Sequence, residues 1–269
     1  RTFRPLRDRM LVAVRNGFRN KQDTISQHTL QQTYAIQGFI FKSGSILHPF
    51  FGDLLQKPLE QRNAERVLTH LLQKAGCSGN TTTIYSVQGL EQDVHFTDQV
   101  LQNTGLSRSY SSTYFLMNLD EPVRIPKQPT GFELATHFDL EDLYPLQAAY
   151  EQEEVLPPGT IFREQHCRTG LKQLLQQQRI IYGTYNGIPA AKANTNAQSY
   201  HRYQLGGIYV VPEFRGKGIG TYIVGKLIEE LQKDDKGISL FVKKENQPAL
   251  RLYQNLGFRI SAEYRISYY

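Results

Sequence analysis

The stretch that decides the fold of this chain spans residues 210–221 and reads VVPEFRGKGIGT. It joins an apolar strand, Gly207 to Val211, to a helix-compatible segment, Thr221 to Lys233. Glycines at such a junction let the backbone approach a ligand closely, because no Cβ stands in the way. The first amides of the following helix have no partners within it, and the helix dipole adds positive character there. The junction therefore predicts a pyrophosphate-binding site.

The spacing of this loop separates it from two commoner phosphate-binding loops. A Walker loop ends in Gly-Lys-Ser/Thr, and a dinucleotide fingerprint reads Gly-x-Gly-x-x-Gly in an early βαβ unit. Here the spacing is Arg-x-x-Gly-x-Gly, from Arg215 to Gly220, after a strand that ends in Val-x-Pro. Arg215 and Lys217 add charge for contacts to phosphate. The pattern resembles the acetyl-CoA signature of the GNAT N-acetyltransferase superfamily, although an ordinary glycine-rich turn remains the alternative.

A second motif runs from Asn246 to Phe258 and reads NQPALRLYQNLGF. Asn246 suits a helix N-cap, Pro248 suits the first turn, and Gly257 suits a left-handed helix end. Apolar residues recur between them at helical spacing: Ala249, Leu252, Tyr253 and Leu256. The segment resembles the second GNAT hallmark, Asn-x-x-Ala-x-x-Leu-Tyr-x-x-x-Gly-Phe. For Tyr253 the alternative role is core packing.

The bulk properties are those of a soluble globular protein with room for two domains. The chain has 269 residues, of which 21% are charged and 39% hydrophobic, and its formal net charge is +6. Basic residues are scattered, so we expect no nucleic-acid partner, and no apolar run predicts a membrane span. Cys77 and Cys167 lack metal-ligand spacing and favour reduced thiols, hence a cytoplasmic location, although pairing stays open. The basic segment 1–20 is interpreted as an amphipathic helix rather than a signal peptide.

A proline-rich polar stretch divides the chain. We expect a degenerate GNAT-like N-terminal domain without a CoA loop over residues 1–121, a linker over 122–130 and a GNAT acetyltransferase domain over 131–269. The fold class implied is α/β (α+β), with two GNAT-like lobes, each a mixed, mostly antiparallel sheet flanked by helices. The arrangement resembles two-lobed bacterial GNAT proteins.

The second half is predicted to alternate strands and helices in the GNAT order. Asp139 is the expected cap of the first helix, and Asn186-Gly187 is a strong hairpin signal. Strands are expected over 132–135, 179–185, 188–196, 203–211, 238–243 and 259–268, and helices over 140–154, 162–178, 221–233 and 248–257.

The first half follows a looser version of the same order. Strands are expected over 44–51, 83–87 and 112–119, and helices over 60–74 and 94–105. The stretch after Pro49 has no Arg-x-x-Gly-x-Gly, and Asp53 would repel a phosphate. We therefore expect this half not to bind acetyl-CoA. Convergence of ordinary α/β patterning is the alternative to a degenerate repeat.

The resemblance implies transfer of an acetyl group from acetyl-CoA, as co-substrate, to a primary amine by direct attack, without a metal. Tyr253 would be the general acid that protonates the leaving thiolate, because its pKa lies above that of a thiol. An amide at Val210 or its neighbour would bind the thioester oxygen. The residues expected to bind the cofactor are Ile208, Tyr209, Val210, Arg215, Gly216, Lys217, Gly218, Ile219, Gly220, Thr221, Asn246 and Tyr253.

The general base is less defined by the sequence. Many relatives carry a glutamate on the strand before the asparagine motif, where this chain has apolar residues near Phe241. Glu153 or Glu154, in a segment that resembles an acidic stretch of two-lobed GNAT proteins, is the candidate base. Solvation or recognition of a cationic acceptor is the alternative for both. His201 and Gln204 are weaker candidates, and a base acting through water would also suffice.

Other readings of the function stay open. A non-catalytic acyl-CoA-binding sensor or regulatory module is the main alternative, and an aminoacyl transferase of the peptidoglycan-bridge type ranks below it. The acceptor is a small amine or an amino terminus, including metabolite amines, polyamines and amino acids. The protein is expected to be a monomer or a homodimer, and the final strand could pair with another chain if its edge is exposed.

Overall fold

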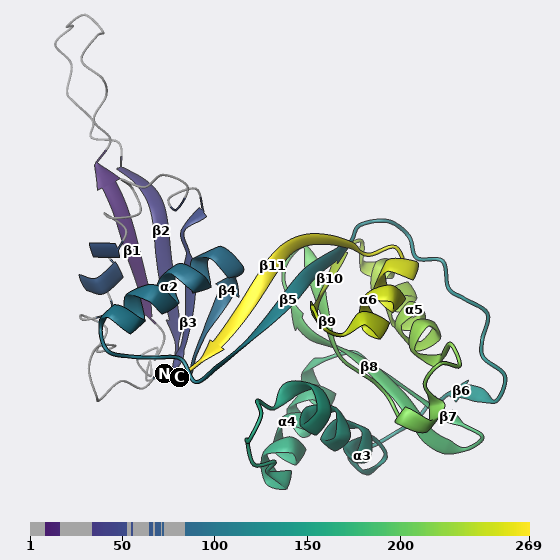
Figure 1. Cartoon of the computed structure of the whole chain (residues 1–269). Helices are drawn as coiled ribbons and strands as arrows, with labels where there is room; N and C mark the ends of the chain where they lie inside the picture. The colour runs from purple at the N-terminus through teal and green to yellow at the C-terminus, as the bar shows by residue number, and fades with distance from the viewer. Residues whose placement is uncertain are drawn as a thin grey trace, which may run out of the picture. The chain divides into compact units, whose positions relative to one another are not determined.

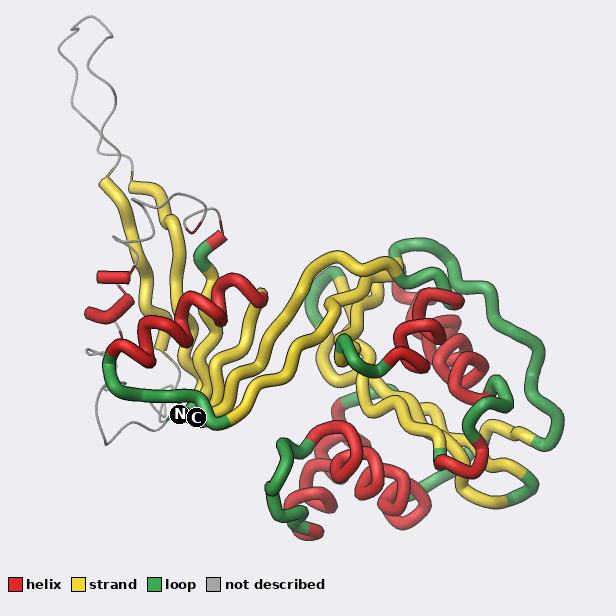
Figure 2. Tube along the Cα trace, in the orientation of Figure 1, coloured by secondary structure: helices red, strands yellow, loops and turns green. Residues whose placement is uncertain are grey.

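The chain forms two compact units, and two of its strands are divided between them. The computed structural model describes residues 9–16, 34–52 and 84–269, together with positions 55, 65, 66, 68–70 and 72. The first unit comprises Arg1–Thr113 with Glu263–Tyr269, and the second comprises Tyr114–Ala262. Two long strands, β5 (Tyr110–Leu119) and β11 (Arg259–Tyr268), therefore contribute one end to each unit (Figures 1 and 2).

The first unit is a sheet with a helix on one face. Its strands lie in the order β1-β2-β3-β4-β11, and α2 packs along β3 and β4 (Figure 1). The helix contributes Val94, Val100 and Leu101 to a buried apolar cluster with the sheet. The remaining bounds are β1 (Arg9–Asn16), β2 (Tyr34–Ser43), β3 (Ile46–Phe50), β4 (Ser86–Leu90) and α2 (Glu91–Asn103).

The second unit is a sheet with a pair of helices on each face. Its strands lie in the order β11-β5-β10-β9-β8-β7-β6. The strands are β6 (Phe132–Leu134), β7 (Ile180–Tyr185), β8 (Ile188–Gln198), β9 (Arg202–Val210) and β10 (Gly237–Lys243). The helices are α3 (Leu140–Tyr150), α4 (Glu164–Gln177), α5 (Ile219–Leu231) and α6 (Gln247–Asn255), with short turns η2 (Glu151–Val155), η3 (Pro212–Phe214) and η4 (Gln232–Asp234).

The two faces of the second sheet bury separate apolar clusters. Alternate strand residues point to opposite faces, so Ala191 and Ala193 meet α5 and α6, whereas Tyr182 and Tyr209 meet α3 and α4. Figure 2 shows α5 and α6 on one side of these strands and α3 and α4 on the other. Both helical layers are needed to cover the sheet, which is the usual solution for a mixed α/β unit.

Both sheets share one pattern of strand pairing. Along β1-β2-β3-β4-β11 the pairs are antiparallel, antiparallel, parallel and antiparallel. Along β7-β8-β9-β10-β5 the same four relations recur in the same order. The degenerate repeat predicted from the sequence stays a prediction, and this shared pattern supports it. The strand β11, at the end of the second half of the chain, pairs with β4 in the first sheet. The strand β5, at the end of the first half, pairs with β10 in the second sheet.

Because β5 and β11 are each divided between the two units, the limits of the units differ from the domain boundaries expected at residues 121 and 131. Residues 114–121 belong to the second unit, and residues 263–269 belong to the first. The sequence identifies strands by local pattern, but the partner of a strand depends on contacts distant in the chain. The proline-rich segment 122–130 lies wholly within the second unit.

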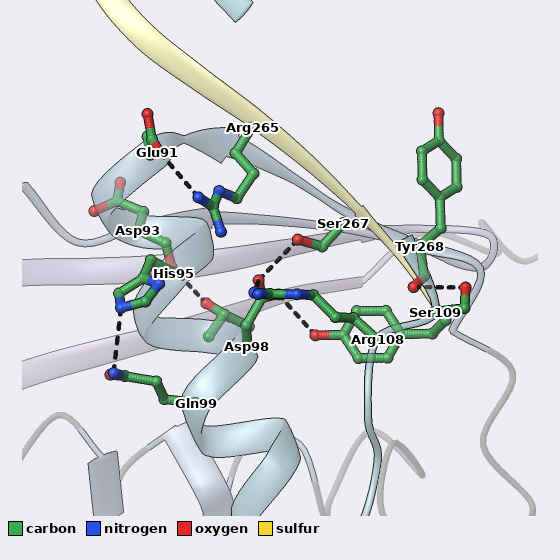
Figure 3. A network of polar contacts seen from close by, with 12 residues as sticks. Glu91, Asp93, His95, Asp98, Gln99, Arg108, Ser109, Arg265, Ser267 and Tyr268 are labelled. Carbon is green, nitrogen blue, oxygen red and sulfur yellow. Dashed lines mark hydrogen bonds and ion pairs between the residues drawn. The ribbon is translucent and has the colours of Figure 1, made fainter. Parts of the chain in front are cut away.

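A polar network fastens the end of β11 into the first unit (Figure 3). The Asp98 carboxylate, on α2, accepts hydrogen bonds from the hydroxyls of Ser267 and Tyr269, both at 2.7 Å. It also pairs with Arg108 at 3.0 Å. Nearby, Arg265 of β11 pairs with Glu91 at the start of α2 at 2.9 Å. The last strand is therefore held by side chains as well as by its ladder with β4.

Two expected helices are corrected by the structure. Residues 9–16 form β1 rather than part of an amphipathic helix, because β-branched residues there suit a strand and β2 supplies its pairing partner. The remainder of the segment 1–20 lies outside the described residues. The helix expected over 140–154 is α-helical only to Tyr150 and continues as the π-turn η2.

Other local predictions are confirmed. The Asp139 carboxylate accepts from the amides of Glu141 and Asp142, at 2.8 and 3.1 Å, and so caps α3. The hairpin between β7 and β8 turns at Asn186-Gly187, where φ is +49° and +81°. Cys167 is a buried free thiol, and Cys77 and Asp53 lie outside the described residues. Of the expected helix 60–74, the described positions 65, 66, 68–70 and 72 are helical.

Candidate functional site

A cavity of about 950 Å³ opens in the second unit where β9 and β10 diverge. The two parallel strands pair from Gly237↔Arg202 to Leu240↔Leu205 and no further along the described ladder. Beyond that point both strands continue as walls of the cavity, with Gly206 to Val210 on one side and Phe241 to Lys243 on the other. The divergence leaves room for an extended ligand between two strands.

The glycine loop after β9 forms one end of the cavity. Gly216 and Gly218 have φ of +77° and +78°, a conformation in which a side chain is strained. At Gly220 an added Cβ would lie 2.9 Å from the Leu252 side chain. Among the described residues, no side chain caps α5, which begins at Ile219. Its first amides, which have no partner within the helix, therefore point toward the cavity mouth with the positive end of the helix dipole.

Arg215 lies beside this loop and is already paired. Its guanidinium donates to the Glu153 carboxylate at 2.8 Å and to the Val210 carbonyl at 2.9 Å. The Tyr209 hydroxyl donates to the same carboxylate at 3.1 Å. The hydrogen bond from Arg215 holds the pKa of Glu153 below its usual value, and partial burial opposes this only in part. Glu153 is thus an anion, and it pairs with Arg215, the arginine that the sequence predicts to bind phosphate.

The start of α6 also lines the cavity. The Asn246 side chain caps the helix by accepting from the Ala249 amide at 3.1 Å, and its amide group donates to Glu154 at 3.2 Å. Lys243 pairs with the same carboxylate at 3.4 Å. Glu154 therefore stands at the point where β10 ends and α6 begins.

Tyr253 lies in the second turn of α6 and lines the cavity, with 7% of its surface exposed. Burial raises the pKa of its phenol well above the usual value, and the nearby Tyr150 and Glu154 add to this. Its ring packs against Phe258 at 5.9 Å between centroids. A phenol with a raised pKa keeps its proton at neutral pH and is therefore in the protonated form that a proton donor requires.

Most of the residues predicted from the sequence as a site are brought together in the structure. The cavity is lined by Glu153, Glu154, Ile208, Tyr209, Val210, Arg215, Gly216, Gly218, Ile219, Gly220, Thr221, Asn246 and Tyr253. Lys217 is not among its lining residues, because its ammonium lies over the rings of Tyr185 and Phe214, at 4.4 and 5.2 Å from their centroids. His201 and Gln204 are not among them either, and His201 is exposed.

Sequence reasoning missed two aromatic residues and a distortion of the central strand. Tyr114 of β5 and Tyr150 of α3 line the cavity. No local signal identifies them, because tyrosines are frequent in this chain. The Gly206-Gly207 pair inside a strand was an available signal for a bulge. In the structure Gly207 has φ of +56°, and the β8–β9 register shifts beside it.

Residues 140–258 match the acetyltransferase (GNAT) family. The match begins with α3 and ends just after α6, so it includes the glycine loop, the divergent strands and Tyr253. Residues 140–258, within the second unit, are thus similar to this family.

The relatives in sequence each match a short part of this chain. An uncharacterized N-acetyltransferase of Methanocaldococcus jannaschii is 38% identical over 81 residues, 29% of this chain and 36% of that protein. A mycothiol acetyltransferase of Brachybacterium faecium is 40% identical over 58 residues, 20% and 18% of the two chains. An L-amino acid N-acyltransferase of Escherichia coli is 35% identical over 57 residues, 21% and 33%. This chain spans little more than a third of their lengths at most.

Solved structures share the fold over most of the chain. A Drosophila protein has a TM-score of 0.62 at 13% identity and covers 86% of this chain and 74% of its own. A tandem GNAT protein from the clavulanic acid biosynthesis pathway has a TM-score of 0.53 at 13% identity, covering 86% and 78%. A GCN5-related N-acetyltransferase from Sphaerobacter thermophilus has a TM-score of 0.55 at 15% identity, covering 86% and 76%. At these identities the likeness concerns the fold alone.

Two other kinds of feature are absent from the described part of the chain. No group of three His, Cys, Asp or Glu side chains there is arranged to hold a metal ion. In the same residues, no helix has the length and apolar character to cross a bilayer.

Proposed function

We propose that the second unit transfers an acetyl group from acetyl-CoA to a primary amine. The observation that carries this proposal is the convergence of three features on one cavity: the glycine loop with the α5 N-terminus, the diverging strands β9 and β10, and the Tyr253 phenol. Each suits a different part of the donor, namely its pyrophosphate, its pantetheine arm and its thioester.

Donor binding follows from the loop and the strand. The amides of Ile219, Gly220 and Thr221 would bind the pyrophosphate, joined by Arg215 once it leaves Glu153. The pantetheine arm would lie along Ile208 to Val210 like an added strand, with main-chain hydrogen bonds in place of those lost to β10. Asn246 would contact the same arm. Lys217, held over aromatic rings, would act on the donor through long-range charge alone.

The chemical step is an addition and an elimination. The amine nitrogen attacks the thioester carbon, and the carbonyl oxygen gains negative charge that a β9 amide stabilises. The carbon–sulfur bond then breaks, the thiolate takes a proton from Tyr253, and the nitrogen loses a proton to a base. We assign that base to Glu154 rather than Glu153, because Glu154 lies close enough to Tyr253 to raise the pKa of its phenol and is held at the start of α6 by Asn246. The products are an N-acetyl amine and CoA.

The N-terminal unit is proposed to bind no acetyl-CoA, so its contribution would be structural. All the described residues that line the cavity lie in the second unit. The acceptor remains a small amine or an amino terminus.

Calorimetric titration of acetyl-CoA into the full chain tests the donor site. Wild-type protein should bind at micromolar concentration, whereas Arg215→Ala and Gly218→Asp should each weaken binding at least about tenfold, the scale of one lost charge-assisted contact. Arg259→Ala, an exposed arginine of the same unit outside the cavity, is the matched control and should bind as wild type. Failure of the folded wild-type protein to bind would overturn the proposal.

A non-catalytic acyl-CoA sensor is the second candidate, because both acidic residues near the thioester position are engaged by other side chains. Release of CoA thiol in the presence of a panel of amines, amino acids and polyamines separates the two functions. Release that depends on an amine supports transfer, and tight binding without release with every amine supports a sensor.

A further inference from the structure

A lysine is buried directly behind the distorted part of β9. Lys192, on β8, is 1% exposed, and its neighbour Asn194 is fully buried. Both side chains lie on the sheet face that α3 and α4 cover, since Ala191 and Ala193 occupy the opposite face. A lysine is rarely fully buried unless its ammonium has partners, so the position of its hydrogen bonds is informative.

The Lys192 ammonium donates to the Gly207 carbonyl at 2.7 Å and to the Asn194 side chain at 3.1 Å. An added Cβ on Gly207 would lie 2.0 Å from the Asn194 amide oxygen and 2.8 Å from the Lys192 nitrogen. These polar side chains therefore fill the space behind the bulge and fix the orientation of the Gly207 peptide group.

That peptide group also contains the amide of Ile208. In a trans peptide the carbonyl and the N–H point in opposite directions, so the Ile208 N–H points away from Lys192. The strand register agrees: Val211 donates to the Ala190 carbonyl on β8 at 2.9 Å. By alternation along β9, the amides of Ile208 and Val210 face the side from which β10 has diverged. Gly207 and Ile208 both line the cavity there.

We propose that Lys192 is a positioning residue for the thioester, which it reaches through the Gly207–Ile208 peptide. By donating a charged hydrogen bond to the Gly207 carbonyl, it holds this peptide in place and polarises it, and the Ile208 N–H then binds the thioester carbonyl oxygen. Hydrogen bonds in a chain strengthen one another in a low-dielectric interior. The inference rests on the proposed acetyl-CoA site and adds to it the group that activates the oxygen-binding amide.

The charges around Lys192 give this arrangement a pH dependence. Burial lowers the pKa of Lys192 to about 7, and the Glu151 carboxylate and the Cys167 thiol partly oppose this. The Tyr150 ring lies 5.0 Å from the ammonium, and the strand neighbours in register are Tyr182 and Tyr209. A depressed lysine pKa means that the ammonium is present below neutrality and is lost as the pH rises through about 7. Polarisation of the Ile208 amide should weaken in the same interval.

Infrared difference spectra of acetyl-CoA with a ¹³C-labelled thioester carbonyl, bound to the full chain, test the inference without an acceptor. In wild-type protein the bound carbonyl band should move to lower wavenumber than that of free acetyl-CoA, because a donated hydrogen bond weakens the C=O bond. Lys192→Met should lose most of this shift. Lys226→Met, the same change at a lysine of α5 that pairs with Glu229 at the surface, should keep it.

Calorimetry on the same samples separates the two proposals. If wild-type protein binds no acetyl-CoA, the proposed function fails and the inference fails with it. If acetyl-CoA binds and the band has the same position in wild type and Lys192→Met, only the role of Lys192 is refuted. CoA lacks the thioester carbonyl, so its affinity should differ less between wild type and Lys192→Met than the affinity of acetyl-CoA does.

A measurement on wild-type protein covers the case in which Lys192→Met does not fold. The band should be shifted at about pH 6 and return toward the free position at about pH 9, because the ammonium is lost between these values. Free acetyl-CoA at each pH is the reference. A bound band that does not change over this range contradicts the proposed role.

Discussion

Single side chains decide the chemistry that the cavity supports, and Tyr253 is the clearest case. Tyr253→Phe should lower turnover by about 10²-fold, the scale of a lost general acid, with little change in acetyl-CoA affinity. Steady-state kinetics and calorimetry measure the two quantities. Tyr222→Phe removes the hydroxyl of another buried tyrosine, which donates to Gln128 rather than facing the cavity, and should behave as wild type. If turnover is unchanged in Tyr253→Phe, Tyr253 contributes to packing and is not the general acid.

Asp93 illustrates a residue whose environment costs stability. Its carboxylate is 1% exposed and accepts from the Phe51 amide at 3.3 Å, while its other oxygen lacks a partner among the described residues. Burial raises its pKa from 3.8 to about 6. The folded state therefore binds the proton more tightly, so this contribution to stability is complete below pH 3.8 and is lost as the pH rises through about 6.

Asp93→Asn should therefore raise the free energy of unfolding by about 2 kcal/mol at pH 8 and change it little near pH 4. Denaturant titrations at the two pH values test this. The exposed Asp120→Asn should show no such pH-dependent gain. An Asn variant that is less stable than wild type at pH 8 would show that the ionised carboxylate is favourable in this site.

At the scale of elements, the π-turn η2 directs its three glutamates to different partners. Glu151 accepts from Gln147, Glu153 from Arg215 and Glu154 from Asn246. A π-turn widens the helix by one residue, and such turns are frequent at functional sites. A continued α-helix would give these side chains different directions.

Opposite effects are expected from the two glutamates that face the cavity. Glu153→Gln should tighten acetyl-CoA binding about two- to fivefold, because the partly exposed ion pair that competes for Arg215 is worth at most about 1 kcal/mol. Glu154→Gln should leave binding near wild type and lower turnover by about 10²-fold. Calorimetry and amine-dependent thiol release measure both variants side by side. The reverse pattern would identify Glu153 as the base.

At the scale of the whole molecule, β11 pairs with β4 and β5 pairs with β10, so each unit depends on a strand from a distant part of the chain. Asp98 anchors the end of β11 to α2 of the first unit (Figure 3). Asp98→Ala should lower the free energy of unfolding of the first unit by about 2–3 kcal/mol, less than for a fully buried ion pair, because Arg108 is 44% exposed.

Hydrogen exchange resolved by segment measures that change. Amides of β4 and of residues 263–269 should exchange faster in Asp98→Ala, while acetyl-CoA affinity stays within about twofold of wild type, since none of these residues lines the cavity. Asp120→Ala, which removes an exposed carboxylate paired with Arg202, is the control. Unchanged exchange in β11 would show that its ladder with β4 suffices to hold it.

Much of the fold and of the candidate site is predictable from local sequence features. The Asp139 cap, the Asn186-Gly187 hairpin and the helix end at Gly257 follow from the short-range conformational preferences of these residues, and the structure contains all three. The family match confirms the resemblance of the GNAT motifs over residues 140–258. The roles of the site residues are proposals that the variants above test.

The sequence by itself determined where the strands, helices and glycine loop lie in the second unit, because capping, glycine conformation and apolar periodicity act within a few residues. Only the tertiary structure decided that β5 pairs with β10 and β11 with β4. It also decided that Glu153 pairs with Arg215 and that Lys192 donates to the Gly207 carbonyl. Each of these depends on residues distant in the chain, whose pairing is selected by burial and by the need of every buried polar group for a partner.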